Sequence, residues 1–248
     1  MKKIVITIST LFALLCVACG GHPVAETKPE PIPLMEVDTT VRGLVIYYPP
    51  TDSIELRCFE RPDPMLDSSI VFCCAAAFTA DWKTEPSHER IQGDHVSRGT
   101  FYRRPGLKRN TGAFFVRDDG RYAFMYSPVA NPETFRPVFE HASTAFTQEM
   151  MIHNGERVKT TRPDRNVNEF RALCLIGHRL CIAGASEAMW FGTFIQLLLN
   201  AGATEALYLD MGPGWNYSWY REYADSNATW IHSATLPSAT NWLVFRRK

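Results

Sequence analysis

The sequence predicts an α+β fold: a mixed, largely antiparallel sheet with a β-hairpin–helix–β crossover unit near the C-terminus. Short segments rich in β-branched and aromatic residues, separated by turn sequences, fill the chain before residue 170. Two apolar runs then flank Gly177-His178, and an amphipathic helix and another apolar run follow them. A strand, a helix and a strand in succession predict a crossover that joins two parallel strands.

Residues 1–18 are typical of a secretory signal peptide. Two lysines precede an apolar run from Ile4 to Ala18, which is too short to span a bilayer. Ala18 is followed by Cys19 and two glycines, a pattern that resembles a bacterial lipobox, with Cys16 where leucine usually stands. We expect an exported, membrane-anchored lipoprotein of a bacterial cell envelope, facing the periplasm or the cell surface. Simple cleavage of the leader without lipidation is the alternative.

Residues 19–39 are expected to form a tether, and residues 40–248 one folded domain. The stretch from His22 to about Val37 is rich in Pro, Glu and Thr and has no core of its own. The chain is 46% hydrophobic and 21% charged, which fits a globular domain with a substantial core. Lys and Arg number 26 against 26 Asp and Glu, so no basic surface is evident and nucleic acid is not expected as a partner.

Strands in the first part of the domain are predicted from alternation and from β-branched residues. Ser69–Ala77 is a continuous apolar run, which is typical of a strand buried on both faces. Turns of the type Asp118-Asp119-Gly120 and His153-Asn154-Gly155 separate successive strands. A short helix is expected near Pro137–Ala145. The other expected strands are Val41–Tyr48, Ser53–Glu60, Thr111–Arg117, Arg121–Tyr126, Gln148–Ile152, Glu156–Val158 and Thr240–Phe245.

A two-residue hairpin around Gly177-His178 fixes a register for its two strands. In that register Arg171 faces Gly184, and Cys174 faces Cys181. The two cysteines are within disulfide reach, and an oxidising compartment permits the bond. We favour free thiols, because both cysteines lie in runs that are typical of a core.

The carboxyl ends of the two parallel strands, with Arg171 and Asp210, are expected at one edge of the sheet. The helix is expected to begin at that edge, with Ser186 as its N-cap and Glu187 in its first turn. An arginine and a helix N-terminus suit a phosphate group, and a neighbouring carboxylate suits proton transfer. The alternative is a structural Arg171–Asp210 salt bridge at the sheet edge.

Four segments occur in an order that resembles the phosphodiester glycosidase family. Residues 75–79, Ala-Ala-Ala-Phe-Thr, are similar to the family's Asn-Gly-Gly-Phe-Phe motif. Residues 206–215 are similar to its Ala-Leu-Asn-Leu-Asp-Gly-Gly-Gly-Ser-Ser motif. Residues 151–156 and 171–173 match its Asn-Gly turn and its Arg-Thr-Ala hairpin. The resemblance spans roughly residues 71–217. The chain departs from the motifs at Ala75, Met211, Pro213, Gly214 and Trp215.

The resemblance implies the fold, a site at this sheet edge, and hydrolysis of a sugar joined through its anomeric oxygen to a phosphodiester. In such a site Arg171 and the helix N-terminus hold the phosphate, and Asp210 or Glu187 acts as a base on water or as a nucleophile. Trp215 and Tyr217 would stack on a sugar face. The residues expected to contact the substrate are Phe78, Thr79, Ser186, Gly212, Gly214, Trp215, Asn216 and Tyr217.

A non-catalytic surface lipoprotein that binds glycan or another envelope component is the competing hypothesis. A glycosidase usually has a second carboxylate within about 10 Å of the first, whereas a binding module needs none. No cofactor is expected. The histidines show no paired ligand spacing, so a metal site is not expected either.

Cys19 is predicted to be the lipidated N-terminus of the mature protein, because the apolar run ends directly before Cys19-Gly20. Mass spectrometry of the natively processed N-terminus should show a lipid-modified cysteine. An unmodified N-terminal residue beyond Cys19 would contradict this prediction.

Overall fold

The computed structural model describes residues 32–79, 90–106, 109–129, 132–237 and 239–247. The expected signal peptide, the lipidation of Cys19 and most of the expected tether lie outside these residues. Met35 is buried, and β1 (Glu36–Asp38) pairs with β2 (Leu44–Tyr48), so the last part of the expected tether belongs to the folded unit. Within the described ranges, no helix is both long enough and apolar enough to cross a bilayer.

The fold is mostly β, which corrects the expected α+β class with its crossover unit. The helices of the described part of the chain are short: α1 (Arg136–Phe139) and α2 (Phe191–Asn200). β12 (Arg171–Ile176) lies between β13 (Arg179–Ala185) and β15 (Ala203–Tyr208) and pairs antiparallel with both. The sequence pattern does not reveal that β12, the first strand of the hairpin, lies between β13 and β15. Because β12 separates these two strands, every strand pair here is antiparallel.

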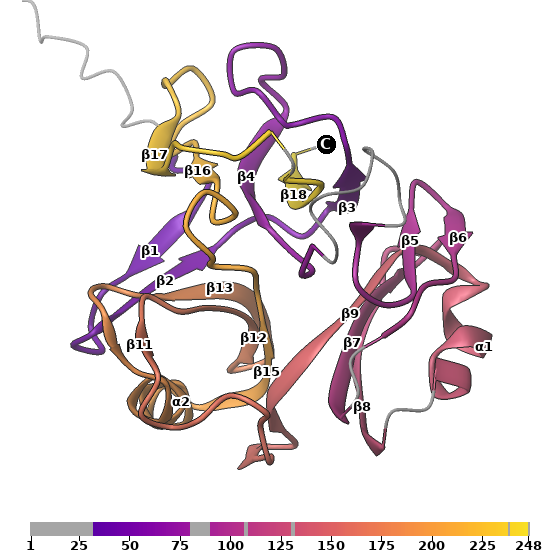
Figure 1. The fold of residues 1–248 in the computed structure, drawn as a ribbon. Helices are drawn as coiled ribbons and strands as arrows, with labels where there is room; N and C mark the ends of the chain where they lie inside the picture. The colour runs from indigo at the N-terminus through magenta and orange to yellow at the C-terminus, as the bar shows by residue number, and fades with distance from the viewer. Residues whose placement is uncertain (1–31, 80–89, 107–108, 130–131, 238, 248) are drawn as a thin grey trace, which may run out of the picture. The chain divides into compact units, whose positions relative to one another are not determined.

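The largest sheet has the strand order β1-β2-β13-β12-β15-β9-β5-β6, with β7 paired to β8 and β9, and β10 to β9 (Figure 1). The hairpin register is confirmed, because Arg171 faces Gly184 and Cys174 faces Cys181. Both cysteines are buried free thiols. The bounds of the remaining strands in this sheet are β5 His95–Ser97, β6 Thr100–Tyr102, β7 Arg109–Arg117, β8 Tyr122–Val129, β9 Ala142–His153 and β10 Glu156–Arg157.

The helix expected near Pro137–Ala145 is wrong in its second half. α1 ends at Phe139, after the 3-10 turn η2 (Pro132–Thr134), and the long strand β9 begins at Ala142. β9 pairs with β7, β15 and β5, so cross-strand packing of its buried residues outweighs a local helical preference.

A second sheet of five strands packs against the first. Its order is β17-β16-β4-β18-β3, and a separate two-stranded sheet joins β11 to β14. β4 is buried along its whole length, as its apolar run predicts. The bounds are β3 Ser53–Cys58, β4 Ile70–Ala75, β11 Val167–Asn168, β14 Met189–Trp190, β16 Ser218–Tyr220, β17 Thr229–His232 and β18 Asn241–Arg246.

The main core lies between the two sheets, where Phe72 and Leu243 of the smaller sheet meet Leu173 and Leu207 of the larger one. A second core lies on the opposite face of β12, β13 and β15. There α2 lies beside the strands of the larger sheet (Figure 1). It packs against them through Phe191, Phe194, Ile195 and Leu198.

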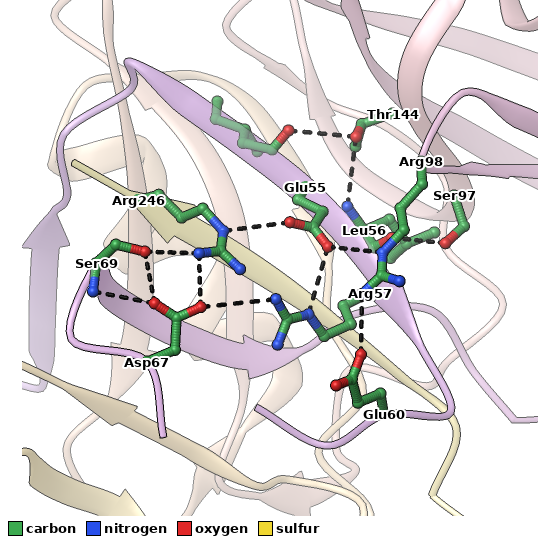
Figure 2. Close-up of polar contacts among 11 residues, drawn as sticks. Glu55, Leu56, Arg57, Glu60, Asp67, Ser69, Ser97, Arg98, Thr144 and Arg246 are labelled. Carbon is green, nitrogen blue, oxygen red and sulfur yellow. Dashed lines mark hydrogen bonds and ion pairs between the residues drawn. The ribbon is translucent and has the colours of Figure 1, made fainter. Parts of the chain in front are cut away.

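An ion-pair network covers the side of β3 and β18 (Figure 2). Arg246 donates to Glu55 at 3.2 Å, to Asp67 at 2.7 Å and to the Ser69 hydroxyl at 2.6 Å. Arg57 donates to the same Glu55 at 3.3 Å. Burial alone would raise the pKa values of Glu55 and Asp67. The neighbouring arginines and the hydrogen bonds have the larger combined effect, so both pKa values lie below their ordinary values.

Arg246→Met is predicted to lower the free energy of unfolding by about 1–2 kcal/mol at pH 7, because Glu55 and Asp67 both lose one of the two arginines that they share. A carboxyl whose pKa is lowered by folding stabilises the folded protein when the pH is above the pKa of that carboxyl in the unfolded chain. This stabilisation is lost as the pH falls through the lowered pKa. The difference from wild type should therefore shrink below about pH 4 in urea unfolding experiments. Arg247→Met, which removes no ion pair with a described residue, is the control. An equal loss in both variants would contradict the prediction.

Candidate functional site

A cavity of about 290 Å³ lies at the start of β12. Its wall includes Tyr47 of β2, Ser186 after β13, Met211 after β15 and His232 of β17, with Arg171 itself. β13 and β15 both run antiparallel to β12, so their carboxyl ends meet the amino end of β12 at this edge. The volume is near the lower end of the range for small-ligand pockets.

Arg171 is only 2% exposed, and its guanidinium crosses from the larger sheet to the smaller one. Nη2 donates to the Ser218 hydroxyl at 2.7 Å and to Nδ1 of His232 at 3.0 Å, and Nη1 donates to the Asn216 carbonyl at 3.3 Å. No carboxylate of a described residue forms an ion pair with it, so the alternative Arg171–Asp210 salt bridge is not present. A buried cation without a counter-ion is costly, which favours an anion in the adjoining cavity.

The contacts of His232 assign its tautomer. A guanidinium only donates, so Nδ1 of His232 accepts from Arg171. Nε2 therefore carries the proton and donates to the Glu169 carboxylate at 3.0 Å. Burial lowers the pKa of His232, and the hydrogen bond to Glu169 opposes that shift. The imidazole is thus neutral near pH 7.

Ser218, His232 and Glu169 lie in a row that resembles a nucleophilic triad. The Ser218 hydroxyl oxygen lies 3.3 Å from Nδ1 of His232, but Ser218 has 0% exposure. Its oxygen accepts from Arg171, and its proton is directed to the Asn216 carbonyl at 3.1 Å. A hydroxyl placed in this way cannot attack a substrate, so Ser218 anchors Arg171.

Asp210 follows β15 and is 8% exposed. Its backbone N–H donates to the Ala76 carbonyl at 2.9 Å, and its Oδ1 accepts from the Gly212 N–H at 3.1 Å. Burial raises the pKa of Asp210 to about 6, although the backbone N–H groups of Gly212 and Thr79 lower it. A carboxyl with a pKa in this range suits general acid–base chemistry. Asp210 does not line the 290 Å³ cavity, but its neighbour Met211 does.

Phe78 and Thr79 lie beside Asp210, so the structure brings together the first and last segments of the family-like pattern. The Phe78 ring packs 5.5 Å from the ring of Tyr208. Thr79 donates its backbone N–H toward Asp210, and its hydroxyl lies 3.2 Å from that of Thr240.

The expected helix start at Ser186 and Glu187 is wrong. Ser186 and Glu187 lie in a bend after β13, Met189–Trp190 then pair with β11, and α2 begins only at Phe191. The first helical N–H groups, those of Phe191 and Gly192, donate to loop carbonyls at 2.9 and 3.0 Å. Glu187 is exposed and does not line the cavity. Neither a helix N-terminus nor Glu187 therefore contributes to this cavity.

Tyr217 packs in the core and is not exposed to a sugar. Its hydroxyl donates to the Pro62 carbonyl at 2.9 Å, and its ring meets Trp242 edge to face. Side-chain alternation from Tyr217 into β16 explains this, because Tyr217 and Trp219 share the face opposite Ser218.

The remaining turn residues have structural roles in this conformation. A Cβ on Gly212 would lie 2.7 Å from the Trp215 ring, so only glycine lets the half-buried indole approach. Gly214 has φ +79°, a left-handed conformation that favours glycine. Asn216 contributes its backbone carbonyl to Arg171.

Sequence reasoning did not identify His232, Ser218, Glu169 or Arg162. The Arg162 guanidinium lies 4.7 Å from the centre of the Tyr208 ring, and its charge lowers the pKa of Asp210. Strand alternation around residue 218 would have placed Ser218 opposite the aromatics. No local sequence pattern predicts the contact between Arg171 and His232. Among the described side chains, no cluster of three His, Cys, Asp or Glu residues could hold a metal ion.

Comparison with solved structures finds a similar fold in the catalytic domain of zebrafish N-acetylglucosamine-1-phosphodiester alpha-N-acetylglucosaminidase, auto-inhibited by its pro-peptide. The TM-score is 0.58 at 12% identity, over 90% of this chain and 85% of that chain. A hypothetical protein from Synechocystis gives 0.50 at 12% identity, over 86% of this chain and 61% of that chain. No family model matches, and the curated proteins give no significant match. The likeness concerns the fold alone, which is phosphodiester glycosidase-like.

Asp210→Asn is predicted to stabilise the protein at pH 7.5 by about 2–3 kcal/mol, because an ionised buried carboxylate is replaced by a neutral amide of the same shape. A carboxyl whose pKa is raised by folding does not reduce the free energy of unfolding at a pH below the pKa that it has in the unfolded chain. It reduces that free energy as the pH rises through about 6. The advantage of the variant should therefore be small at pH 4 in urea unfolding experiments. The same advantage at both pH values would be inconsistent with a raised pKa.

Proposed function

We propose that this protein is a cell-envelope hydrolase that removes a sugar from a sugar-1-phosphodiester. The observation that carries the proposal is the buried Arg171 guanidinium, which lines a cavity without a carboxylate partner among the described residues. The similarity of the fold to a phosphodiester glycosidase domain over 90% of the chain supports the same reaction class. The lipobox-like sequence at Cys19 supports the envelope location.

In this proposal Arg171 binds the phosphate group and Asp210 acts on the anomeric centre. Water attacks the anomeric carbon, the bond from that carbon to the phosphate-bearing oxygen breaks, and a phosphate monoester leaves. Asp210 takes the proton of the water as a general base, or it attacks first as a nucleophile. The raised pKa of Asp210, about 6, keeps it largely ionised at pH 7 and still able to hold a proton. General base catalysis contributes roughly 10²–10⁴-fold.

A glycan-binding module is the second candidate function. Trp230 is 45% exposed and directly precedes Ile231 and His232, which line the cavity. The Trp230 ring packs edge to face on Tyr217 and does not line the cavity, but the exposed part of an indole is suited to stacking on a sugar ring. In this reading Arg171 binds an anionic group of the glycan without hydrolysis.

Asp210→Asn is predicted to lower kcat on a sugar-1-phosphodiester at least 100-fold, because the base or nucleophile is lost. Arg171→Lys should raise KM and lower kcat, because lysine cannot form the same fork of hydrogen bonds. Release of free sugar from a panel of such diesters is the measurement.

The matched control is Glu187→Gln, which removes an exposed carboxylate away from the cavity and should leave activity unchanged. Full activity of Asp210→Asn would eliminate the mechanism. Sugar binding without any release of sugar by the wild-type protein would favour the glycan-binding module.

A further inference from the structure

His232 lies between the buried Arg171 guanidinium and the exposed Glu169 carboxylate. Its Nδ1 lies 3.0 Å from Nη2 of Arg171, and its Nε2 lies 3.0 Å from Glu169. His232 comes from β17 of the smaller sheet, whereas Arg171 comes from β12 of the larger one. Both residues line the cavity, so a ligand that enters it meets a guanidinium and an imidazole together.

The contact between Arg171 and His232 requires a neutral imidazole. A protonated imidazole has no acceptor, so its Nδ1–H and the guanidinium would be two donors and two positive charges facing each other. Such a pair is stable only when an acceptor with negative charge lies between them. An oxyanion in the cavity supplies that acceptor, while Glu169 retains the hydrogen bond from Nε2.

We infer that Arg171 and His232 together form a proton-coupled oxyanion site, in which binding of a phosphate-type anion is accompanied by uptake of one proton at Nδ1 of His232. Both side chains then donate to the anion. The inference rests on the proposed function only in taking the natural anion to be the phosphate of a phosphodiester.

The neighbouring titratable groups affect the protonation of His232 and the charge of the site. Glu169, from the segment before β12, favours the protonated imidazole, whereas Arg171 opposes it in the empty site. Tyr47 of β2 lines the cavity, and burial raises its pKa, so it stays a neutral donor. Burial raises the pKa of Cys74 of β4 to about 11, so the thiol adds no negative charge beside Arg171.

The direction of the pH dependence follows from these charges. Burial holds the pKa of His232 below its usual value in the empty site, and an adjacent anion raises it. At a pH between the pKa of His232 in the empty site and its pKa in the anion-bound site, anion affinity should rise as the pH falls. The increase is up to about tenfold per pH unit for one coupled proton. A histidine that does not change its protonation state would give no slope.

Isothermal titration of the whole protein with sulfate tests the inference, because sulfate keeps its charge between pH 5.5 and 8. Titrations in buffers of different ionisation enthalpy count the protons taken up. We expect sulfate affinity to increase toward pH 5.5, with proton uptake on binding. Sulfate binding with no proton uptake, or no sulfate binding at any pH, would overturn the inference.

His232→Asn is the decisive variant, because its amide oxygen can accept from Arg171 where Nδ1 did but cannot titrate. It should bind sulfate with no proton uptake and with a flat pH profile. His141→Gln, which changes an exposed histidine in the turn after α1, should keep the wild-type profile. Persistent proton uptake in His232→Asn would overturn the inference. If this variant unfolds, His232→Gln provides the same comparison.

A final arm separates this inference from the proposed function. Dimethyl phosphate, a phosphodiester without a sugar, replaces sulfate in the same titrations. Proton-coupled binding of both anions without hydrolysis of any sugar-1-phosphodiester would uphold the site and reject the enzyme. Hydrolysis with a pH-independent affinity for both anions would uphold the enzyme and reject the coupling.

Discussion

The burial of one arginine between two sheets is the constraint on which the candidate site depends. Arg171 starts on the central strand of the larger sheet, and its guanidinium is held by β16 and β17 of the smaller sheet. Neutral groups make all of these contacts: a hydroxyl, an imidazole and a backbone carbonyl. The geometry of the guanidinium is therefore fixed while its charge stays available.

A second arginine, Arg246, shows how a partly buried arginine is held when carboxylates of the same chain pair with its charge. Arg246 also reaches across strands, but it shares Glu55 and Asp67 with Arg57 in a network of matched charges (Figure 2). Its charge is neutralised within the chain, so it stabilises strand packing and has no charge left for a ligand. The two arginines differ in the chemistry of their partners, and that difference separates a structural role from a binding role.

The sequence allowed correct predictions where local geometry decides the outcome. The two-residue turn set the register that places Arg171 opposite Gly184, and the uninterrupted apolar run of β4 indicated burial on both faces. The helix start failed because Met189–Trp190 pair with another segment, which a capping pattern cannot reveal. The fold class failed for a similar reason, since strand order is a property of distant pairings. His232 lies 61 residues from Arg171 in the chain, and only the meeting of the two sheets joins them.

The outer strand β3 has a further consequence. The edge of β3 that faces away from β18 is occupied by side chains of the other sheet. The Ser97 hydroxyl donates to the Leu56 carbonyl at 2.8 Å, and Thr144 accepts from the Leu56 N–H and donates to the Ile54 carbonyl (Figure 2). These hydroxyls satisfy groups that an open edge would offer to a strand of another molecule. Two small side chains thus protect this edge from intermolecular pairing and aggregation.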